Sequence, residues 1–447
     1  MKKKTAKLSL FAITWPLFIE IMLYMLMGNA DTLMLSQYSD NSVAAVGVSN
    51  QILSMVIVMF GFVATGTAIL VAQNLGAERD DEAREVSSVS IGANLVFGIL
   101  LSAAVFIFSE QLLKLMDLPP ELFDEANSYL KIVGGFSFIQ SLIMTVSSII
   151  RSYGFTRDIM YVTIGMNVLN VIGNYFFIFG PFGFPILGVE GVAISTTVSR
   201  IFGLLAAIFV MTKRIPGSLP LSMLFSFPKR HLKNLLNIGI PSAGEHLSYN
   251  GSQMVITYFI ASLGTQALTA KVYTQNVMMF IFLFSIAISQ GTQILIGHMV
   301  GAKEVENAYK RALKSLKLAI LISIAAAVIV SFFSKNLLGI FTDNLSIIEL
   351  GTILILLTII LEPGRSFNLV LISSLRAAGD VKFPVYMGIL SMWGVSVTLS
   401  YFLGIYLEMG LVGIWIAFIA DEWLRGLLML WRWRSRVWVK KSFVTAE

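Results

Sequence analysis

Long apolar runs separated by short polar segments dominate this chain. A membrane-spanning helix needs about 20 predominantly apolar residues. Twelve segments are long enough, at 8–36, 42–74, 87–109, 126–150, 158–180, 190–212, 234–262, 267–299, 313–334, 347–374, 383–405 and 410–431. Each is too long for a buried strand, which favours helices. The pattern therefore predicts an all-α integral membrane protein with twelve transmembrane helices.

Lysine and arginine residues fall on one side of the predicted membrane. They precede the first span and follow every even-numbered span, for example at Arg79, Arg151 and Arg432. The loops on the other side hold little beyond Lys114 and Lys335. Because positively charged loops stay in the cytoplasm, we expect both termini there.

The amino-acid composition narrows the class of protein further. Only 13% of the 447 residues are charged and 56% are hydrophobic, whereas soluble domains are about 25% charged. The absence of cysteine excludes disulfides, iron–sulfur clusters and thiol catalysis. His231, His246 and His298 form no closely spaced pair, so we expect no metal site. The net charge of +6 follows the sidedness of the membrane and does not indicate nucleic acid.

The chain contains an internal repeat. The segment 66–83 (GTAILVAQNLGAERDDEA) matches 291–308 (GTQILIGHMVGAKEVENA) at seven of eighteen positions, with an offset of 225 (291 − 66). The same offset aligns Pro16 with Pro241 and the RSYG motif at 151–154 with RAAG at 376–379. Neither glycine-rich stretch carries the Gly-Lys-Ser/Thr of a phosphate loop, so ATP is not expected.

The repeat predicts two halves of six helices each. We expect a first lobe at 1–213, a cytoplasmic linker at 214–229 that is rich in proline, and a second lobe at 230–447. Since six is even, both halves enter the membrane in the same direction, and a pseudo-two-fold axis along the membrane normal should relate them. This organisation is typical of transporters that work by alternating access.

The first span carries an acid deep in its apolar run. Glu20, Tyr24, Met27 and Asp31 lie on one helical face, at i, i+4, i+7 and i+11. An ionisable side chain inside a bilayer is costly and usually functional, so Asp31 is a candidate proton-coupling residue. The alternative is a half-hydrated acid near the outer end of the helix.

A second polar face lies in the fifth span. Asn167, Asn170 and Asn174 are spaced i, i+3 and i+7. Amides can hydrogen-bond both forms of a carboxyl group, so this face is a candidate partner for Asp31 in a substrate and proton pocket. Polar contacts between helices are the alternative.

The second half holds its own intramembrane charges. Glu245, like Glu20, follows a proline by four residues, and Glu362 and Arg365 lie one turn apart in the tenth span. These residues either form an ion path in the second lobe or neutralise each other. The set of Asp421, Glu422 and Arg425 allows the same two interpretations.

Three segments form a distinctive set of motifs. They are the repeated segment after the second and eighth spans, NADTLMLSQYSDNSVAAVG at 29–47, and RSYGFTRDIMYVTIGMNVLNVIGNYFFIFG at 151–180. Together they resemble the multidrug and toxin extrusion (MATE) family, most closely its bacterial DinF branch. The resemblance covers nearly the whole chain. It implies a proton- or sodium-coupled antiporter that exports organic cations from the bacterial plasma membrane.

The resemblance also assigns residues. The family's coupling acid in the first helix falls on Asp31, its polar pair in the fifth helix on Asn170 and Asn174, and its sixth-helix threonine on Thr196. Sodium-coupled relatives hold acids at the positions of Tyr249 and Arg365 in this chain, which favours protons as the coupling ion.

We therefore predict a proton-coupled multidrug antiporter, driven by the proton gradient without any cofactor, and not an enzyme. Its partners would be cationic amphiphilic molecules, protons and the bilayer, and we expect a monomer. The spans of the first half hold almost no cationic residues, which favours cationic cargo. A flippase for lipids or lipid-linked saccharides and a sodium-coupled drug antiporter are the alternatives.

Overall fold

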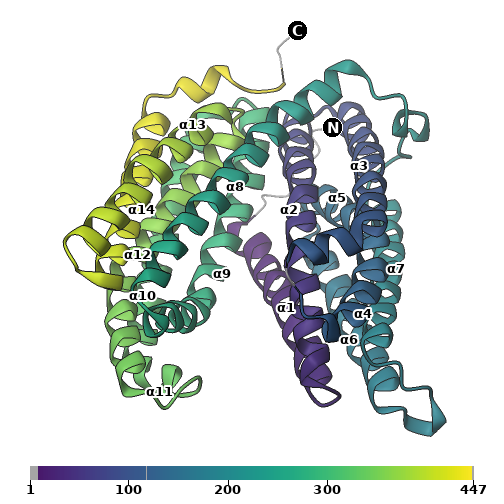
Figure 1. Ribbon diagram of the computed structural model, residues 1–447. Helices are drawn as coiled ribbons and strands as arrows, with labels where there is room; N and C mark the ends of the chain where they lie inside the picture. The colour runs from purple at the N-terminus through teal and green to yellow at the C-terminus, as the bar shows by residue number, and fades with distance from the viewer. Residues whose placement is uncertain (1–8, 117, 445–447) are drawn as a thin grey trace. The chain divides into compact units, whose positions relative to one another are not determined.

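The computed structural model describes residues 9–116 and 118–444. Every regular element in these two ranges is helical (Figure 1). The first half contains α1 (Leu10–Ser36), α2 (Asp40–Gly76), α3 (Asp80–Leu115), α4 (Pro120–Tyr129), η1 (Leu130–Gly134), α5 (Phe138–Ser152), α6 (Thr156–Phe179), η2 (Pro181–Gly183) and α7 (Gly188–Arg214).

The remaining elements follow a connection that holds η3 (Leu221–Leu224). They are α8 (Lys229–Ser262), α9 (Thr265–Gly301), α10 (Val305–Phe332), α11 (Ser334–Gly339), α12 (Leu345–Ala377), α13 (Lys382–Ser391), η4 (Met392–Val397), η5 (Ser400–Tyr406), α14 (Gly410–Arg434) and η6 (Val437–Lys440). Each of the twelve predicted spans coincides with a helix or a run of helical elements, so the predicted all-α membrane fold is confirmed.

Two spans are interrupted. The fourth consists of α4, η1 and α5, with a bend of 42° at the break before Phe138, and the eleventh passes from α13 into the π-helical η4 and η5. By length and apolarity, nine helices of the described residues can cross a membrane, and the bent α4–α5 pair makes ten. Helices α8 and α14 are more polar; α14 holds three charged residues within five positions, at 421–425.

The helices form two compact units. The first-half unit consists of Trp15–Val71 and Arg79–Gly239, and the second-half unit of Met1–Thr14, Ala72–Glu78 and Ile240–Glu447. These boundaries differ from the repeat boundaries. The first turns of α1 are grouped with the second half, and the first turns of α8 are grouped with the first half.

Two contacts at equivalent glycines explain why the first turns of α1 and α8 are grouped with the other half. A Cβ atom on Gly66 would lie 3.4 Å from Leu235 in the first turns of α8. A Cβ atom on Gly291, the repeat equivalent of Gly66, would lie 3.6 Å from Leu10 in the first turn of α1. Because glycine has no side chain, another helix can pack closely against it at each site. Pro16 and Pro241 occupy equivalent positions just beyond these contacts, within α1 and α8.

Packing inside each unit positions the polar residues. In the first-half unit, α5 packs against α3 and α7, and α6 lies against α7. In the second-half unit, α12 packs against α9, α10 and α14. The indole rings of Trp433 and Trp438 stack there with centroids 4.2 Å apart. Helices α6 and α7 together carry the candidate polar residues Asn170, Asn174 and Thr196.

The repeated Arg-x-x-Gly motif ends α5 and α12. Gly154 and Gly379 have φ angles of 90° and 93°, in the left-handed region that favours glycine. The backbone N–H groups of Phe155 and Asp380 donate to carbonyls five residues earlier and close the two helix ends. The motif thereby leaves its arginine in the last turn of each helix.

Candidate functional site

Asp31 and Asn174 are joined by a short hydrogen bond. Asp31 lies on α1 with 5% of its surface exposed, and Asn174 lies on α6 and is fully buried. The side-chain amide of Asn174 donates to Oδ1 of Asp31 at 2.5 Å. A buried carboxylate needs a polar partner of this kind, and α6 supplies it.

The hydrogen bonds continue from α6 to α7. The Asn174 amide also lies 3.5 Å from Oδ1 of Asn170, and the Asn170 amide donates to the Thr196 hydroxyl at 3.2 Å. The Ser195 hydroxyl donates to the Asn170 carbonyl at 2.9 Å. Four of the sequence-predicted residues therefore form one hydrogen-bonded chain from α1 through α6 to α7. We name Asp31, Asn170, Asn174 and Thr196 the polar chain.

A cationic side chain, that of Arg200, interacts electrostatically with the polar chain. Arg200 follows Thr196 by one turn of α7 and interacts electrostatically with Asp31, Tyr24 and Tyr129. Its Nε is buried and makes no hydrogen bond within the described residues. This arginine was not singled out from the sequence, in which the first-half spans hold almost no cationic residues. The signal was available, since position 200 lies well inside the apolar run 190–212.

Tyr129 was also missed from the sequence. It is 2% exposed, interacts electrostatically with Asp31 and Arg200, and donates from its hydroxyl to Oδ1 of Asn50 at 3.3 Å. The residue comes from α4, directly before the π-helical η1. Nothing in the local sequence pattern of α4 indicated that this tyrosine interacts with the acid on α1.

The other predicted first-half residues lie around this group. Glu20 is 3% exposed, and both of its oxygens accept hydrogen bonds from Arg151 at 3.2 and 3.3 Å. Tyr24 interacts electrostatically with Glu20, Arg151 and Arg200. It therefore interacts with the Glu20–Arg151 pair and with the arginine that accompanies Asp31.

Met27 and Asn167 have weaker links to the polar chain. Met27 is 7% exposed and is buried on the same helix as Asp31. Asn167 donates its amide to the backbone carbonyl of Thr163 in its own helix, at 2.8 Å. Within the described residues, no hydrogen bond joins Asn167 to Asp31, Asn170 or Asn174.

The second half contains a charged network between α12 and α14. Oε1 of Glu362, a fully buried residue, accepts a hydrogen bond from Arg365 at 2.7 Å. Arg365 Nε lies 3.6 Å from Glu422, which also accepts from the Asn368 amide at 2.9 Å. Tyr249 on α8 interacts electrostatically with Arg365 and Glu422.

Arg425 completes the network. It lies 2.7 Å from Asp421 and 3.0 Å from Glu422, and Asp421 also accepts a hydrogen bond from the Ser391 hydroxyl at 2.5 Å. Three carboxylates thus share two guanidinium groups. Oε2 of Glu362 is buried and has no hydrogen-bond partner in the described residues. The geometry satisfies the pairing interpretation for most of these groups and leaves one carboxylate in excess.

Glu245 belongs to a different pair. Its Oε2 accepts a hydrogen bond from Arg376 at the end of α12. No hydrogen bond or ion pair among the described residues joins it to Glu362 or Arg365. The three residues considered for a second-lobe ion path therefore fall into two separate groups.

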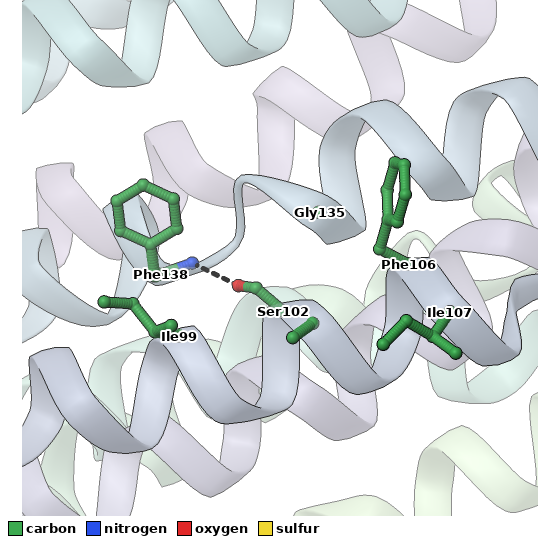
Figure 2. A pocket seen from close by; sticks show the side chains of 7 residues that line it. Ile99, Ser102, Phe106, Ile107, Gly135 and Phe138 are labelled. Carbon is green, nitrogen blue, oxygen red and sulfur yellow. Dashed lines mark hydrogen bonds between the residues drawn. The ribbon is translucent and has the colours of Figure 1, made fainter.

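An open apolar pocket lies elsewhere in the first-half unit (Figure 2). It has a volume of about 260 Å³ and is lined by α3, Gly135 and Phe138. The Ser102 hydroxyl accepts a hydrogen bond from the Phe138 backbone N–H at 2.8 Å, which holds the break before α5. The large side chains of Phe106 and Ile107 are more than half exposed, at 52% and 65%. None of the polar-chain residues lines this pocket.

The MatE family model matches residues 16–176 and 241–402. The chain belongs to the MatE family. The two matched segments begin at Pro16 and Pro241, which are equivalent positions of the internal repeat. MatE proteins are transporters, so the prediction that this chain is a multi-pass membrane transporter and not an enzyme is confirmed.

Relatives of known sequence span nearly the whole MatE chain. The chain is 59% identical over 443 residues to the uncharacterized transporter YisQ of Bacillus subtilis, covering 99% of this chain and 97% of that protein. It is 28% identical over 449 residues to the probable multidrug resistance protein NorM of Thermotoga maritima, covering 100% and 95%.

Solved structures agree in fold. An outward-facing multidrug resistance MATE transporter of the MOP superfamily aligns with a TM-score of 0.88 at 20% identity, covering 99% of this chain and 100% of that one. A MOP superfamily transporter from Pyrococcus furiosus aligns with a TM-score of 0.87 at 21% identity, covering 97% and 96%. These matches establish the MatE fold.

Proposed function

We propose that this MatE transporter is a proton-coupled multidrug antiporter of the bacterial plasma membrane that exports organic cations. The observation that carries the proposal is the buried Asp31 carboxylate, which is hydrogen-bonded to Asn174 and interacts electrostatically with Arg200. A single carboxyl group can couple two fluxes if its two protonation states differ in affinity for the cargo.

Protonation changes the charge of the pocket. When Asp31 is ionised, its charge is balanced by Arg200, and a cation meets a locally neutral site that contains a carboxylate. When Asp31 takes up a proton, Arg200 is left without its counter-charge, and the site becomes positive. A bound organic cation is then repelled as well as deprived of its partner, and it leaves.

The asparagines can hydrogen-bond both the ionised and the protonated form of the Asp31 carboxyl group. The Asn174 amide donates to the ionised carboxylate, and an amide oxygen can accept from the protonated acid. Thr196 and Asn170 extend the chain to α7, so a change at Asp31 is transmitted to the helix that carries Arg200. Proton release on the cytoplasmic side, where we place both termini, would restore the affinity for cations.

Protons are favoured over sodium by the residues of the second half. Tyr249 and Arg365 stand where sodium-coupled relatives carry acids, and Arg365 is held by Glu362 and Glu422. A guanidinium group at this position repels a sodium ion. We propose that the proton gradient alone drives transport, without ATP.

The test is ethidium efflux from proteoliposomes in sodium-free buffer under an imposed pH gradient. Wild-type protein should transport, and Asp31→Asn should lose at least about 90% of the rate, because its neutral amide carries no exchangeable proton. Asp40→Asn, an exposed acid at the start of α2, is the matched control and should transport normally. Strict dependence on sodium, or normal efflux by Asp31→Asn, would contradict the proposal.

A further inference from the structure

A second cluster of ionisable side chains lies at the beginnings of α3 and α8 and shares no residue with the polar chain. Glu82 and Glu85 occupy the first two turns of α3, and His231 occupies the first turn of α8. Within the part of the chain that the structure describes, these three residues form the one group of acidic and histidine side chains suited to hold a metal ion. All three belong to the first-half unit.

The spacing of the three ligand atoms suits a small divalent cation. His231 Nε2 lies 3.2 Å from Glu85 Oε2 and 3.9 Å from Glu82 Oε2, and all three ligand atoms lie within 4.8 Å of one another. Two ligands held about 2.0–2.1 Å from a tetrahedral zinc ion lie about 3.3 Å apart. The Glu85 and His231 atoms already have this separation, and Glu82 needs a small side-chain adjustment.

Burial divides the cluster into a fixed and an accessible part. The His231 side chain is 7% exposed, whereas those of Glu82 and Glu85 are 30% and 36% exposed. The imidazole is therefore held by the protein, and the carboxylates border solvent. A metal ion can enter from the solvent side and complete its coordination with water.

The charges also favour a cation. Arg230 lies 3.5 Å from Oε1 of Glu82 and compensates one carboxylate, while Oε2 of the same group faces His231. With a neutral imidazole, these four residues carry a net charge of −1. A divalent cation is attracted to the two carboxylates and accepts the imidazole nitrogen as a third ligand.

We propose that Glu82, Glu85 and His231 bind one divalent cation of the zinc class and so join the start of α8 to the start of α3. Mixed imidazole and carboxylate ligands suit zinc better than magnesium or calcium, which prefer oxygen ligands alone. Sequence spacing could not predict the site, because Glu85 and His231 are 146 residues apart.

The site lies at the end of the connection between the two halves. Earlier in that connection, Arg84 of α3 donates to the Pro216 carbonyl at 2.9 Å, and Gly92 of α3 lies directly against the backbone of Leu224. The metal site adds a third attachment to the same helix, where the chain enters α8. This inference does not depend on the ion or cargo that the transporter moves.

Zinc titration of the purified full-length protein tests the site. The protein carries an affinity tag without histidine, is stripped with EDTA and is titrated with Zn²⁺ alone by calorimetry. Wild type should bind one equivalent. His231→Gln and Glu85→Gln should each weaken binding at least about tenfold, since even second-shell losses commonly cost about 10–100-fold. The matched controls Asp81→Asn and His298→Gln should bind like wild type.

Cobalt provides a readout that an ordinary His–Glu ion pair cannot give. Co²⁺ bound at the site should show the visible absorption of a low-coordinate complex with a nitrogen ligand, and this absorption should be lost in His231→Gln. Size-exclusion profiles in EDTA establish that each variant is folded, and the more exposed Glu85→Gln replaces His231→Gln if the latter does not fold. Absence of saturable Zn²⁺ binding to wild type overturns the proposal, and so does unchanged binding in the folded variants.

Discussion

Arg151 donates to both carboxylate oxygens of Glu20, at 3.2 and 3.3 Å, and so ties the end of α5 to α1. The second half repeats the relationship at the equivalent positions, where Arg376 at the end of α12 binds Glu245 of α8. Each arginine is the first residue of an Arg-x-x-Gly motif, and each glutamate follows a helix proline. The repeated motif therefore anchors the proline-containing helix of its own half.

A double-mutant cycle measures the first of these pairs. Glu20→Gln and Arg151→Gln should each lower stability, because each leaves a buried charge without its partner. The double variant should recover part of the loss, with a coupling energy of about 1–3 kcal/mol. Thermal or denaturant unfolding in detergent gives the values. Purely additive losses would show that the pair does not interact energetically.

The asparagines of α6 should differ sharply in importance. Asn174→Leu removes the amide that donates to Asp31 and should reduce ethidium efflux at least about tenfold, since an unsatisfied buried carboxylate costs about 1–3 kcal/mol or more. Asn167→Leu, on the same helix, removes only a bond to its own backbone and should change efflux by less than about twofold. Equal effects of the two variants would mean that the polar chain has no special role.

Arg200→Gln tests the charge balance of the pocket. Without the guanidinium group, the ionised Asp31 carboxylate has no counter-charge, so a monovalent organic cation should bind more tightly at neutral pH. Release to the exterior should become slower, because protonation of Asp31 no longer leaves a positive site. Fluorescence titration with ethidium gives the affinity, and Arg214→Gln, an exposed arginine paired with Asp158, is the control. Weaker ethidium binding to Arg200→Gln would rule out this role for the arginine.

Drug binding should depend on pH through Asp31. Acid neutralises the carboxylate and should weaken ethidium binding, whereas higher pH should strengthen it; by linkage, bound ethidium should in turn oppose protonation. Equilibrium binding to purified protein from about pH 5 to about pH 8 covers the expected range for a buried carboxyl group. Asp31→Asn should bind ethidium with an affinity that does not vary with pH. A flat wild-type profile, or the same slope in both proteins, would exclude Asp31 as the titrating group.

The last turns of α2 and α9 depend on two glycines. A Cβ atom on Gly76 would overlap the His298 carbonyl oxygen, and one on Gly301 would overlap that of Gln73. Gly76→Ala should therefore destabilise the protein by about 1–3 kcal/mol, the usual cost of overpacking.

Gly47→Ala is the control on the same helix. A Cβ atom there meets nothing within 4 Å, so this variant should be neutral or slightly stabilising. Thermal unfolding of both variants in one detergent compares them, and an unchanged melting temperature for Gly76→Ala would refute the close contact.

Local patterns in the chain were sufficient to predict the helices, the repeat and the intramembrane acids. Apolar runs of bilayer length leave a chain with no alternative to helices, because backbone polar groups in lipid must bond within the segment. The repeat offset followed from matched motifs, and the family match begins its two segments, at Pro16 and Pro241, with the same offset. Helical periodicity also placed Asn170 and Asn174 on one face, which is why this part of the polar chain could be proposed in advance.

Which helix faces meet could not be predicted from local patterns. Periodicity shows which residues share a face of one helix, but it does not show which helix packs against that face. For this reason the pairing of Glu20 on α1 with Arg151 at the end of α5 could not be predicted from the sequence. Arg200 interacts electrostatically with Asp31 across 169 positions of sequence (200 − 31), and the first turns of α1 and α8 pack with the opposite halves at Gly291 and Gly66. These contacts arise from side-chain packing between distant helices, which no local pattern in the chain specifies.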